Sequence, residues 1–127
     1  MKKVILTVAF TAITAFASST TINATMSLME EGLVQVQKGF LYSSQDDIVR
    51  GVETIESANA IFTHVDVSTF IQNNSKVQVT KNINKNLSEH LKALKKDVKA
   101  KKYSDASEKY AKVVNDCVSC HTIIRGW

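Results

Sequence analysis

Apolar residues recur at alternating intervals of three and four positions in four separate stretches of this chain, at 26–40, 48–62, 83–98 and 106–124. That spacing is typical of amphipathic helices that bury one stripe against each other. Proline is absent and glycine occurs only 4 times in 127 residues, so little in the sequence would interrupt a helix. We therefore predict an all-α fold, an antiparallel up-down-up-down four-helix bundle with short links.

Residues 1–24 have the character of a secretory signal peptide. A pair of lysines precedes an apolar run at 4–17, and small residues provide two candidate cleavage positions, after Ala24 or alternatively after Ala17. The alternative is a retained anchor, although such a run is short of the roughly 20 apolar residues of a membrane span. We expect an exported, periplasmic protein whose residues 25–127 form one domain.

Cys117, Cys120 and His121 form the motif C-x-x-C-H on the last predicted helix, and the chain contains no other cysteine. This motif is the attachment signature of c-type haem. Two thiols three positions apart share one side of a helical turn, where they can form thioethers with the two vinyl groups of one porphyrin edge. The histidine that follows can bind the iron as its proximal ligand. The motif predicts one covalently bound haem c, in agreement with export.

Two other uses of the cysteine pair stay open. A structural zinc site usually needs four Cys or His ligands, and the remaining histidines, His64 and His90, lie far from the motif in sequence. A thiol–disulfide oxidoreductase would use Cys117 and Cys120 without haem, but such a pair normally lies at a helix N-terminus after a strand. No acid–base pair, nucleophile motif or phosphate-binding loop is recognisable, so the sequence does not predict an enzyme.

The bundle topology predicts where the haem lies. In an up-down-up-down bundle the last helix runs antiparallel to the first, so His121 should lie near the start of the first helix, with the haem slotted at that end. Met26 and Met29 lie there on the apolar stripe of the first helix, the seam along which the helices pack. Because a thioether sulfur can bind haem iron, we predict Met26, and after it Met29, as the candidate distal ligand. The alternative is an open distal face, with both methionines packing in the core.

An exported chain with four predicted helices and a C-terminal C-x-x-C-H motif resembles the cytochrome c′ family of bundle cytochromes. Arg125, four residues after His121, matches an arginine that commonly follows the haem histidine in that family. The resemblance implies that Arg125 lies near His121 or a haem propionate. It also implies that any homodimer forms through the first two helices.

The resemblance leaves two functions open. The family has six-coordinate members with a methionine ligand, and five-coordinate members that bind gases. We expect a monohaem c-type cytochrome that acts as a one-electron carrier for a redox partner protein. The alternative is a five-coordinate haem protein that binds nitric oxide or carbon monoxide.

Charge is divided unevenly along the chain. Residues 25–75 contain seven acidic and two basic side chains, whereas residues 76–127 contain twelve basic and five acidic ones. One interpretation is that lysines of the third helix dock an acidic redox partner by long-range attraction. The alternative is ordinary solvated helix faces, with attraction between the two halves. Nucleic-acid binding is not expected, because aromatic residues do not interleave with the basic ones. The lysines concerned are Lys92, Lys95, Lys96 and Lys99.

Overall fold

The computed structural model describes the backbone of residues 8–69 and 74–125, and the side chains of residues 20–68 and 76–124. Within these ranges the chain is helical, without β-strands. The predicted all-α four-helix bundle is confirmed. The elements are α1 (Val8–Leu41), α2 (Gln45–Thr63), the short 3-10 helix η1 (Val67–Thr69), α3 (Asn74–Lys99) and α4 (Tyr103–Arg125).

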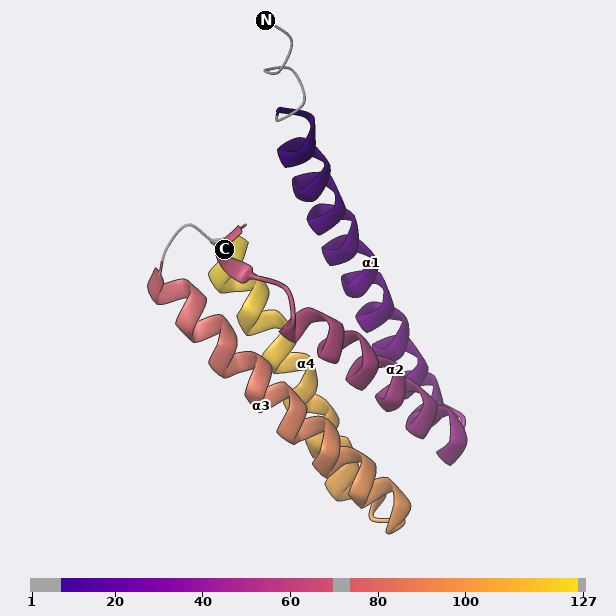
Figure 1. Cartoon of the computed structure of the whole chain (residues 1–127). Helices are drawn as coiled ribbons and strands as arrows, with labels where there is room; N and C mark the ends of the chain where they lie inside the picture. Colours follow the sequence, from indigo (N-terminus) through magenta and orange to yellow (C-terminus); the bar gives the residue numbers. More distant parts are fainter. Residues whose placement is uncertain (1–7, 70–73, 126–127) are drawn as a thin grey trace, which may run out of the picture.

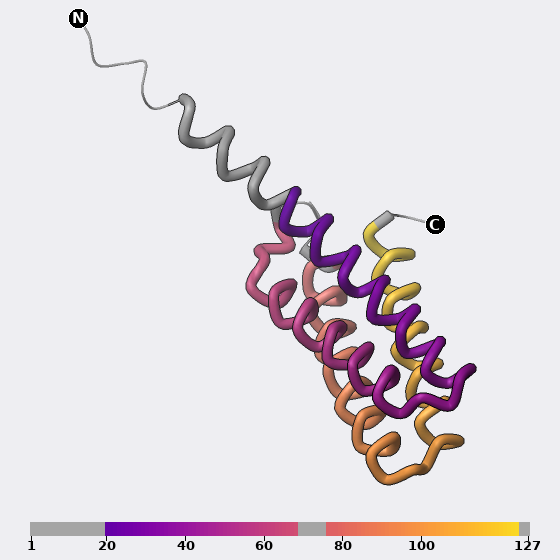
Figure 2. The backbone as a smooth tube through the Cα atoms, turned by 90° about the vertical axis from the view of Figure 1, so that its right-hand side faces the viewer, coloured from indigo at the N-terminus to yellow at the C-terminus, as the bar shows by residue number. Residues whose placement is uncertain are grey.

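The four helices pack as two antiparallel hairpins. α1 packs along α2, and α3 packs along α4, while α2 joins the hairpins by packing against α3 (Figure 1). α1 and α4 have the least extensive contact of the neighbouring helices. Figure 2 shows that the C-terminus of α4 lies at the same end of the bundle as the N-terminal part of α1. An up-down-up-down topology requires this arrangement.

Glycine allows α1 and α2 to approach each other closely. A Cβ atom added to Gly51 would lie 2.7 Å from the Gly32 carbonyl oxygen, and one added to Gly32 would lie 2.8 Å from the Gly51 carbonyl oxygen. A larger residue at either position would force the two backbones apart. Gly39 repeats the arrangement near the turn, where an added Cβ would lie 2.7 Å from the backbone nitrogen of Ile48. These glycines therefore serve helix packing.

The two tight turns end α1 and α3 in the same way. Ser43 after α1 and Lys101 after α3 have left-handed backbone, with φ of 55° and 59°. The N–H of the next residue donates to the carbonyl oxygen of Gly39 in the first turn (2.8 Å) and of Asp97 in the second (2.9 Å). This is the Schellman ending of a helix, which usually has glycine at the left-handed position. The chain makes both turns without one.

α1 begins at Val8 and runs without a break through both predicted cleavage positions, Ala17 and Ala24. The signal peptide and its cleavage site stay predictions. Among the residues that the structure describes, no helix combines the length and the apolar character that crossing a membrane requires.

Candidate functional site

The predicted cofactor residues lie where the packed core becomes less complete. Along α4, Ala106 and Val113 are fully buried, whereas Cys117, Cys120 and Ile124 on the same stripe are only half-buried. The apolar stripe of α4 thus continues to the end of the helix, but its last residues are not fully covered by the other helices. Partly accessible apolar side chains in one place are typical of a surface that a ligand or partner covers.

Some apolar residues of α1 and α3 are only half-buried toward the same end of the bundle, although the hydroxyl-bearing Thr25 and Thr80 there are buried. On α1, Val36 is fully buried, whereas Met26, nearer the start of the helix, is half-buried. On α3, Leu91 is fully buried, whereas Ile83, also nearer the start, is half-buried. Three of the four helices therefore carry partly accessible apolar side chains toward the same end of the bundle.

A hydrogen bond between α1 and α4 fixes which of their residues lie at the same level. The Tyr110 hydroxyl donates to the Leu33 carbonyl oxygen (3.1 Å), and the Tyr110 ring packs on Phe40 with centroids 5.9 Å apart. Two helical turns, about 10 Å, lead from Leu33 back to Met26 and from Tyr110 forward to Cys117. Because the helices are antiparallel, Met26 and Cys117 lie at the same level of the bundle.

Cys117 lies two helical turns beyond Tyr110 on the same stripe of α4. Burial raises the pKa of Tyr110, and the charge of a Cys117 thiolate raises it further. Burial also raises the pKa of the Cys117 thiol to about 11, and the charges of Asp116 and Cys120 act in the same direction. Burial raises the pKa of Cys120 as well. Both thiols are free and protonated at neutral pH.

The two candidate methionines have different environments. Met29 is 8 % exposed and belongs to the closed core, whereas Met26 is half-buried and packs against the edge of that core. Met29 also lies about one turn, roughly 5 Å, deeper along α1. Periodicity alone could not separate the two residues, since both occupy the seam. The structure brings Met26, rather than Met29, to the level of Cys117.

His121 is exposed and lies one turn beyond Cys117 on α4, so the thiols and the imidazole share one helical segment. Arg125 is the last residue of α4, one turn beyond His121, and its side chain lies outside the described residues. His64 caps the C-terminus of α2 and is exposed.

An ion pair joins α3 to α4 beside the cysteines. His90 Nδ1 lies 2.6 Å from Asp116 Oδ2, and the two side chains are 30 % and 11 % exposed. Asp116 directly precedes Cys117. The sequence analysis missed Asp116, although an acidic residue beside a seam position, with a seam histidine on the preceding helix, was a usable signal.

A second polar contact lies close to this pair. The Asn59 amide Nδ2 donates to Ser88 Oγ (2.8 Å), and Ser88 is two residues before His90 on α3. Asn59 is 3 % exposed, and its Oδ1 has no hydrogen-bond partner among the described residues. Asn59, Ser88, His90 and Asp116 thus form a polar layer that crosses α2, α3 and α4 within about one turn of Cys117.

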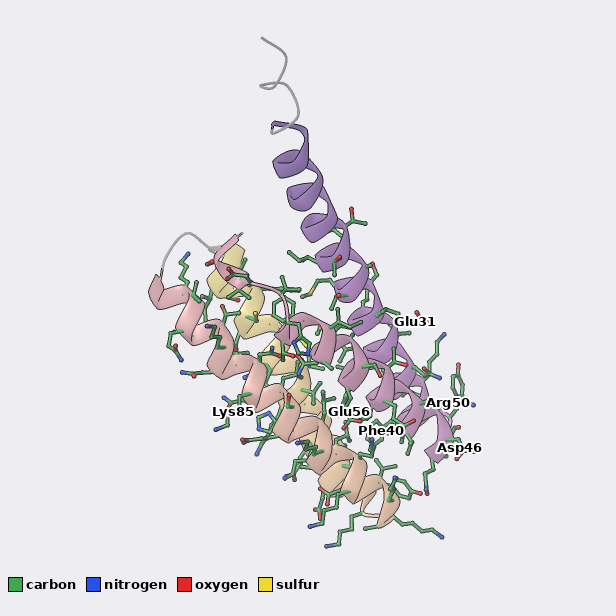
Figure 3. All side chains as sticks on the ribbon, in the orientation of Figure 1. Glu31, Phe40, Asp46, Arg50, Glu56 and Lys85 are labelled. Carbon is green, nitrogen blue, oxygen red and sulfur yellow. The ribbon has the colours of Figure 1, made fainter. Side chains whose placement is uncertain are left out.

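The acidic and basic halves of the chain meet between α2 and α3. Lys95 Nζ lies 2.6 Å from Glu56 Oε2 and 3.5 Å from Glu53 Oε1, and the hydrogen bond to Glu56 is the main cause that raises the pKa of Lys95. Of the four lysines predicted to dock a partner, this one is paired inside the molecule, whereas the other three are exposed. Figure 3 shows Lys85 on the side of α3 away from α1 and α2.

Comparison of the chain with protein-family models, with curated proteins and with solved structures finds no match. Among the side chains that the structure describes, no three of His, Cys, Asp or Glu gather as they would around a metal ion. The resemblance to the cytochrome c′ family therefore rests on the C-x-x-C-H motif and on the four-helix pattern.

Proposed function

We propose that this protein is a periplasmic monohaem cytochrome c that carries one electron at a time. The observation that supports the proposal is the place of the C-x-x-C-H motif. Its free thiols lie at the end of the bundle where the seams of α1, α3 and α4 remain partly accessible. Cys117 and Cys120 would hold the porphyrin through thioethers, and His121 would supply the proximal nitrogen. The bound haem would supply the one-electron redox chemistry.

The residues present fit such a group. One rigid helix, α4, holds both thiols and the imidazole in fixed order, which orients the attached group without a loop. Half-buried Met26, Leu33 and Ile124 would cover apolar porphyrin surface and exclude water from it. In the proposed arrangement, the Met26 thioether approaches from the opposite helix at the level of Cys117, and Arg125 contributes a fixed positive charge one turn beyond His121.

The environment of the thiols disfavours the thiol–disulfide alternative. A reactive cysteine in such an enzyme has a lowered pKa, usually at a helix N-terminus. Here burial raises the pKa of Cys117 to about 11, and the pair lies in the C-terminal part of α4, where the helix dipole disfavours a thiolate. Protonated, partly buried thiols are better suited to attachment than to exchange.

Covalent attachment is the first test. Protein matured with a cytochrome c assembly system should exceed the mass of the mature chain by one haem, and acid–acetone extraction should leave the haem on the protein. Cys117→Ala with Cys120→Ala should abolish attachment, whereas Val118→Ala, at an exposed position between them, should not. Extractable haem or two intact thiols in the matured protein would contradict the proposal.

The distal ligand separates electron carriage from gas binding. If Met26 binds the iron, the wild-type spectrum is low-spin, and Met26→Ala converts it to high-spin and opens the site to carbon monoxide. Met29→Ala is the matched control, because it removes a buried side chain of the same kind one turn away and should leave the spectrum low-spin. A wild-type protein that is already high-spin and binds carbon monoxide directly would favour the gas-binding function.

Partner docking is proposed to involve the lysines of α3. Lys85 lies five residues from His90 toward the thiol end, whereas Lys99 lies nine residues from it toward the other end. We therefore expect Lys85→Gln to slow electron transfer to an acidic partner more than Lys99→Gln, and both effects to fade with added salt. Rates that do not depend on salt would leave only the solvated-face interpretation. A homodimer through α1 and α2 stays a prediction, and exposed Leu41 and Tyr42 on that hairpin favour it.

A further inference from the structure

We infer that this protein self-associates head to tail, with the lysine-rich side of α3 in one copy docked on a hollow along the acidic side of α1 in the next copy. The partner is a second copy of this chain, because the chain itself presents both a negative surface and a positive one. Residues 25–75 contain seven acidic and two basic side chains, and residues 76–127 contain twelve basic and five acidic ones. Opposite charges on two surfaces steer their encounter and fix how they fit together.

The negative surface is a hollow of about 550 Å³ that follows α1 and ends at the start of α2. Its charged lining residues are Glu30, Glu31, Lys38 and Asp47. Asp47 is already paired with Arg50, whereas Glu30 and Glu31 have no ion-pair partner among the described side chains. Val34 adds accessible apolar area, since it is 43 % exposed. Apolar area beside unpaired carboxylates suits a basic protein surface better than a lone cation.

The positive surface is a stripe of lysines along α3. Successive members lie four, seven, four and three residues apart, which keeps them on one side of the helix. The stripe consists of Lys81, Lys85, Lys92, Lys96 and Lys99, all of them exposed. One exposed acid, Glu89, lies on the same line, so the stripe stays strongly positive. It is about 27 Å long, enough to span the hollow, whose α1 residues extend over about 17 Å from Ser27 to Lys38.

The two surfaces cannot neutralise each other within one molecule. α1 and α3 each pack against α2 and α4, and among the described residues they make no contact with each other. They therefore occupy opposite corners of the bundle, and Figure 3 shows Glu31 and Lys85 on opposite sides of it. Between the acidic and basic halves, the ion pairs among the described side chains join Lys95 to Glu53 and Glu56. Glu30, Glu31 and the lysine stripe are left for another molecule.

The contact joins two different surfaces, so each copy in a pair keeps one hollow and one stripe free. Association then continues beyond two copies, into a chain or a closed ring. A dimer that two copies form through the same α1–α2 surface would stop at two. Because the charged groups are exposed, salt should weaken the head-to-tail contact strongly.

Sedimentation equilibrium of the purified protein measures this association. At an ionic strength of about 0.01 M, the average mass should rise with protein concentration past that of a dimer, and at about 0.15 M it should fall toward that of the monomer. A wild-type protein that stays monomeric up to about 1 mM at the lower ionic strength would overturn the inference. An average mass that levels off at the dimer and does not depend on salt would overturn it as well.

Charge reversal tests which surfaces meet. Glu30→Lys with Glu31→Lys makes the hollow basic, and Lys85→Glu with Lys92→Glu removes the net positive charge of the stripe. Each double variant alone should stay monomeric at low salt. An equimolar mixture should associate, because the first variant keeps an unaltered stripe and the second an unaltered hollow. A mixture that associates no more than the separate variants would overturn the inference.

A single reversal provides the matched control. Lys112 is exposed on α4 and lies outside both surfaces, so Lys112→Glu changes the net charge of the protein as much as Lys85→Glu does. We expect Lys85→Glu to raise the dissociation constant at low salt by about fivefold or more, and Lys112→Glu by less than about twofold. Circular dichroism checks that both variants keep the helical content of the wild type. Equal effects of the two reversals would mean that net charge, rather than the stripe, controls association, and would overturn the inference.

Discussion

The two hairpins of the bundle are held together by different means. Between α1 and α2 the backbones touch, because Gly32 and Gly51 leave no room for a Cβ atom. Between α3 and α4 the contact is made by side chains, from fully buried Leu91 to the ion pair of His90 and Asp116. The first hairpin contributes the candidate methionines to the proposed site, whereas the second carries the thiols, the imidazole and the ion pair of His90 and Asp116.

The first hairpin therefore mainly supports the bundle, whereas the second carries most of the functional groups of the proposed site. Backbone contact where the two helices cross at glycine leaves them little freedom to shift, so α1 and α2 form a rigid pair. The α3–α4 interface is made of large and charged side chains. It can hold functional groups at different levels along the bundle, and its residues can become more accessible toward one end. The comparison predicts that substitutions at the glycine crossing of the first hairpin change stability alone, whereas those beside the cysteines in the second hairpin also change the properties of the site.

The largest expected effect is the loss of a fully buried side chain from the second hairpin. Leu91→Ala should lower the free energy of unfolding by about 2–5 kcal/mol, because it leaves a cavity in the core. Val79→Ala on the same helix removes a side chain that is 41 % exposed and should change stability by no more than about 0.5 kcal/mol. Chemical denaturation measures both. Similar values for the two variants would mean that the α3–α4 seam is not closely packed.

The glycine crossing gives the next effect. Gly51→Ala should destabilise the protein by about 1–3 kcal/mol, because the added methyl group overpacks the interface. The sign is informative, since alanine in place of glycine otherwise favours a helix by about 1 kcal/mol. Ser57→Ala, at an exposed position of α2, should be neutral or slightly stabilising. A Gly51→Ala protein as stable as the wild type would show that α1 and α2 can separate without cost.

Seam residues were predictable because helical periodicity alone decides which face is buried. Val36, Ile55 and Val98 are fully buried, as expected. The roles of glycine were not predictable in the same way. Gly51 lies inside a predicted helical stretch, where periodicity gives it no role, but it serves a crossing, while Ser43 and Lys101 make the turns. Those roles depend on how close two helices come, which no local pattern encodes.

The candidate site was predictable in part for a similar reason. The C-x-x-C-H motif is local, so its three residues could be identified directly. The partnership of His90 with Asp116 depends on the rotation and height of α3 against α4, and the choice between Met26 and Met29 depends on the height of α1 against α4. The partnership of His90 with Asp116 becomes visible only when a contact across the helices fixes the register, and the choice of distal ligand stays a prediction.

Alkaline pH should destabilise the apoprotein through the half-buried thiol of Cys117. The pKa of Cys117 is about 11 in the folded chain against 9.0 for a free thiol, so the unfolded chain loses this proton first. Between these values the folded state binds more protons, and stability falls as pH rises. We expect a decline of about 1–2 kcal/mol, reduced for partial exposure. The measurement is denaturation at pH 8 to 11. Cys117→Ala should decline less, and equal declines would contradict the raised pKa.

The smallest effect concerns the contact that joins the first hairpin to the second through α1 and α4. Tyr110→Phe keeps the ring on Phe40 but removes the donor to the Leu33 carbonyl oxygen. We expect a loss of about 0.5–1.5 kcal/mol in unfolding free energy. Tyr103→Phe is the matched control, because its hydroxyl donates to Gln45 at an exposed site (3.1 Å), and it should cost less.

The same Tyr110→Phe variant also asks whether the register between α1 and α4 matters for the site. If the hydrogen bond keeps Met26 level with Cys117, its removal in the holoprotein should raise the fraction of protein that binds carbon monoxide, whereas Tyr103→Phe should not. A change in stability without a change in carbon monoxide binding would mean that close packing of α1 on α2 already holds Met26 in place. The packing of α1 on α2, rather than the contact between α1 and α4, would then determine the distal side of the site.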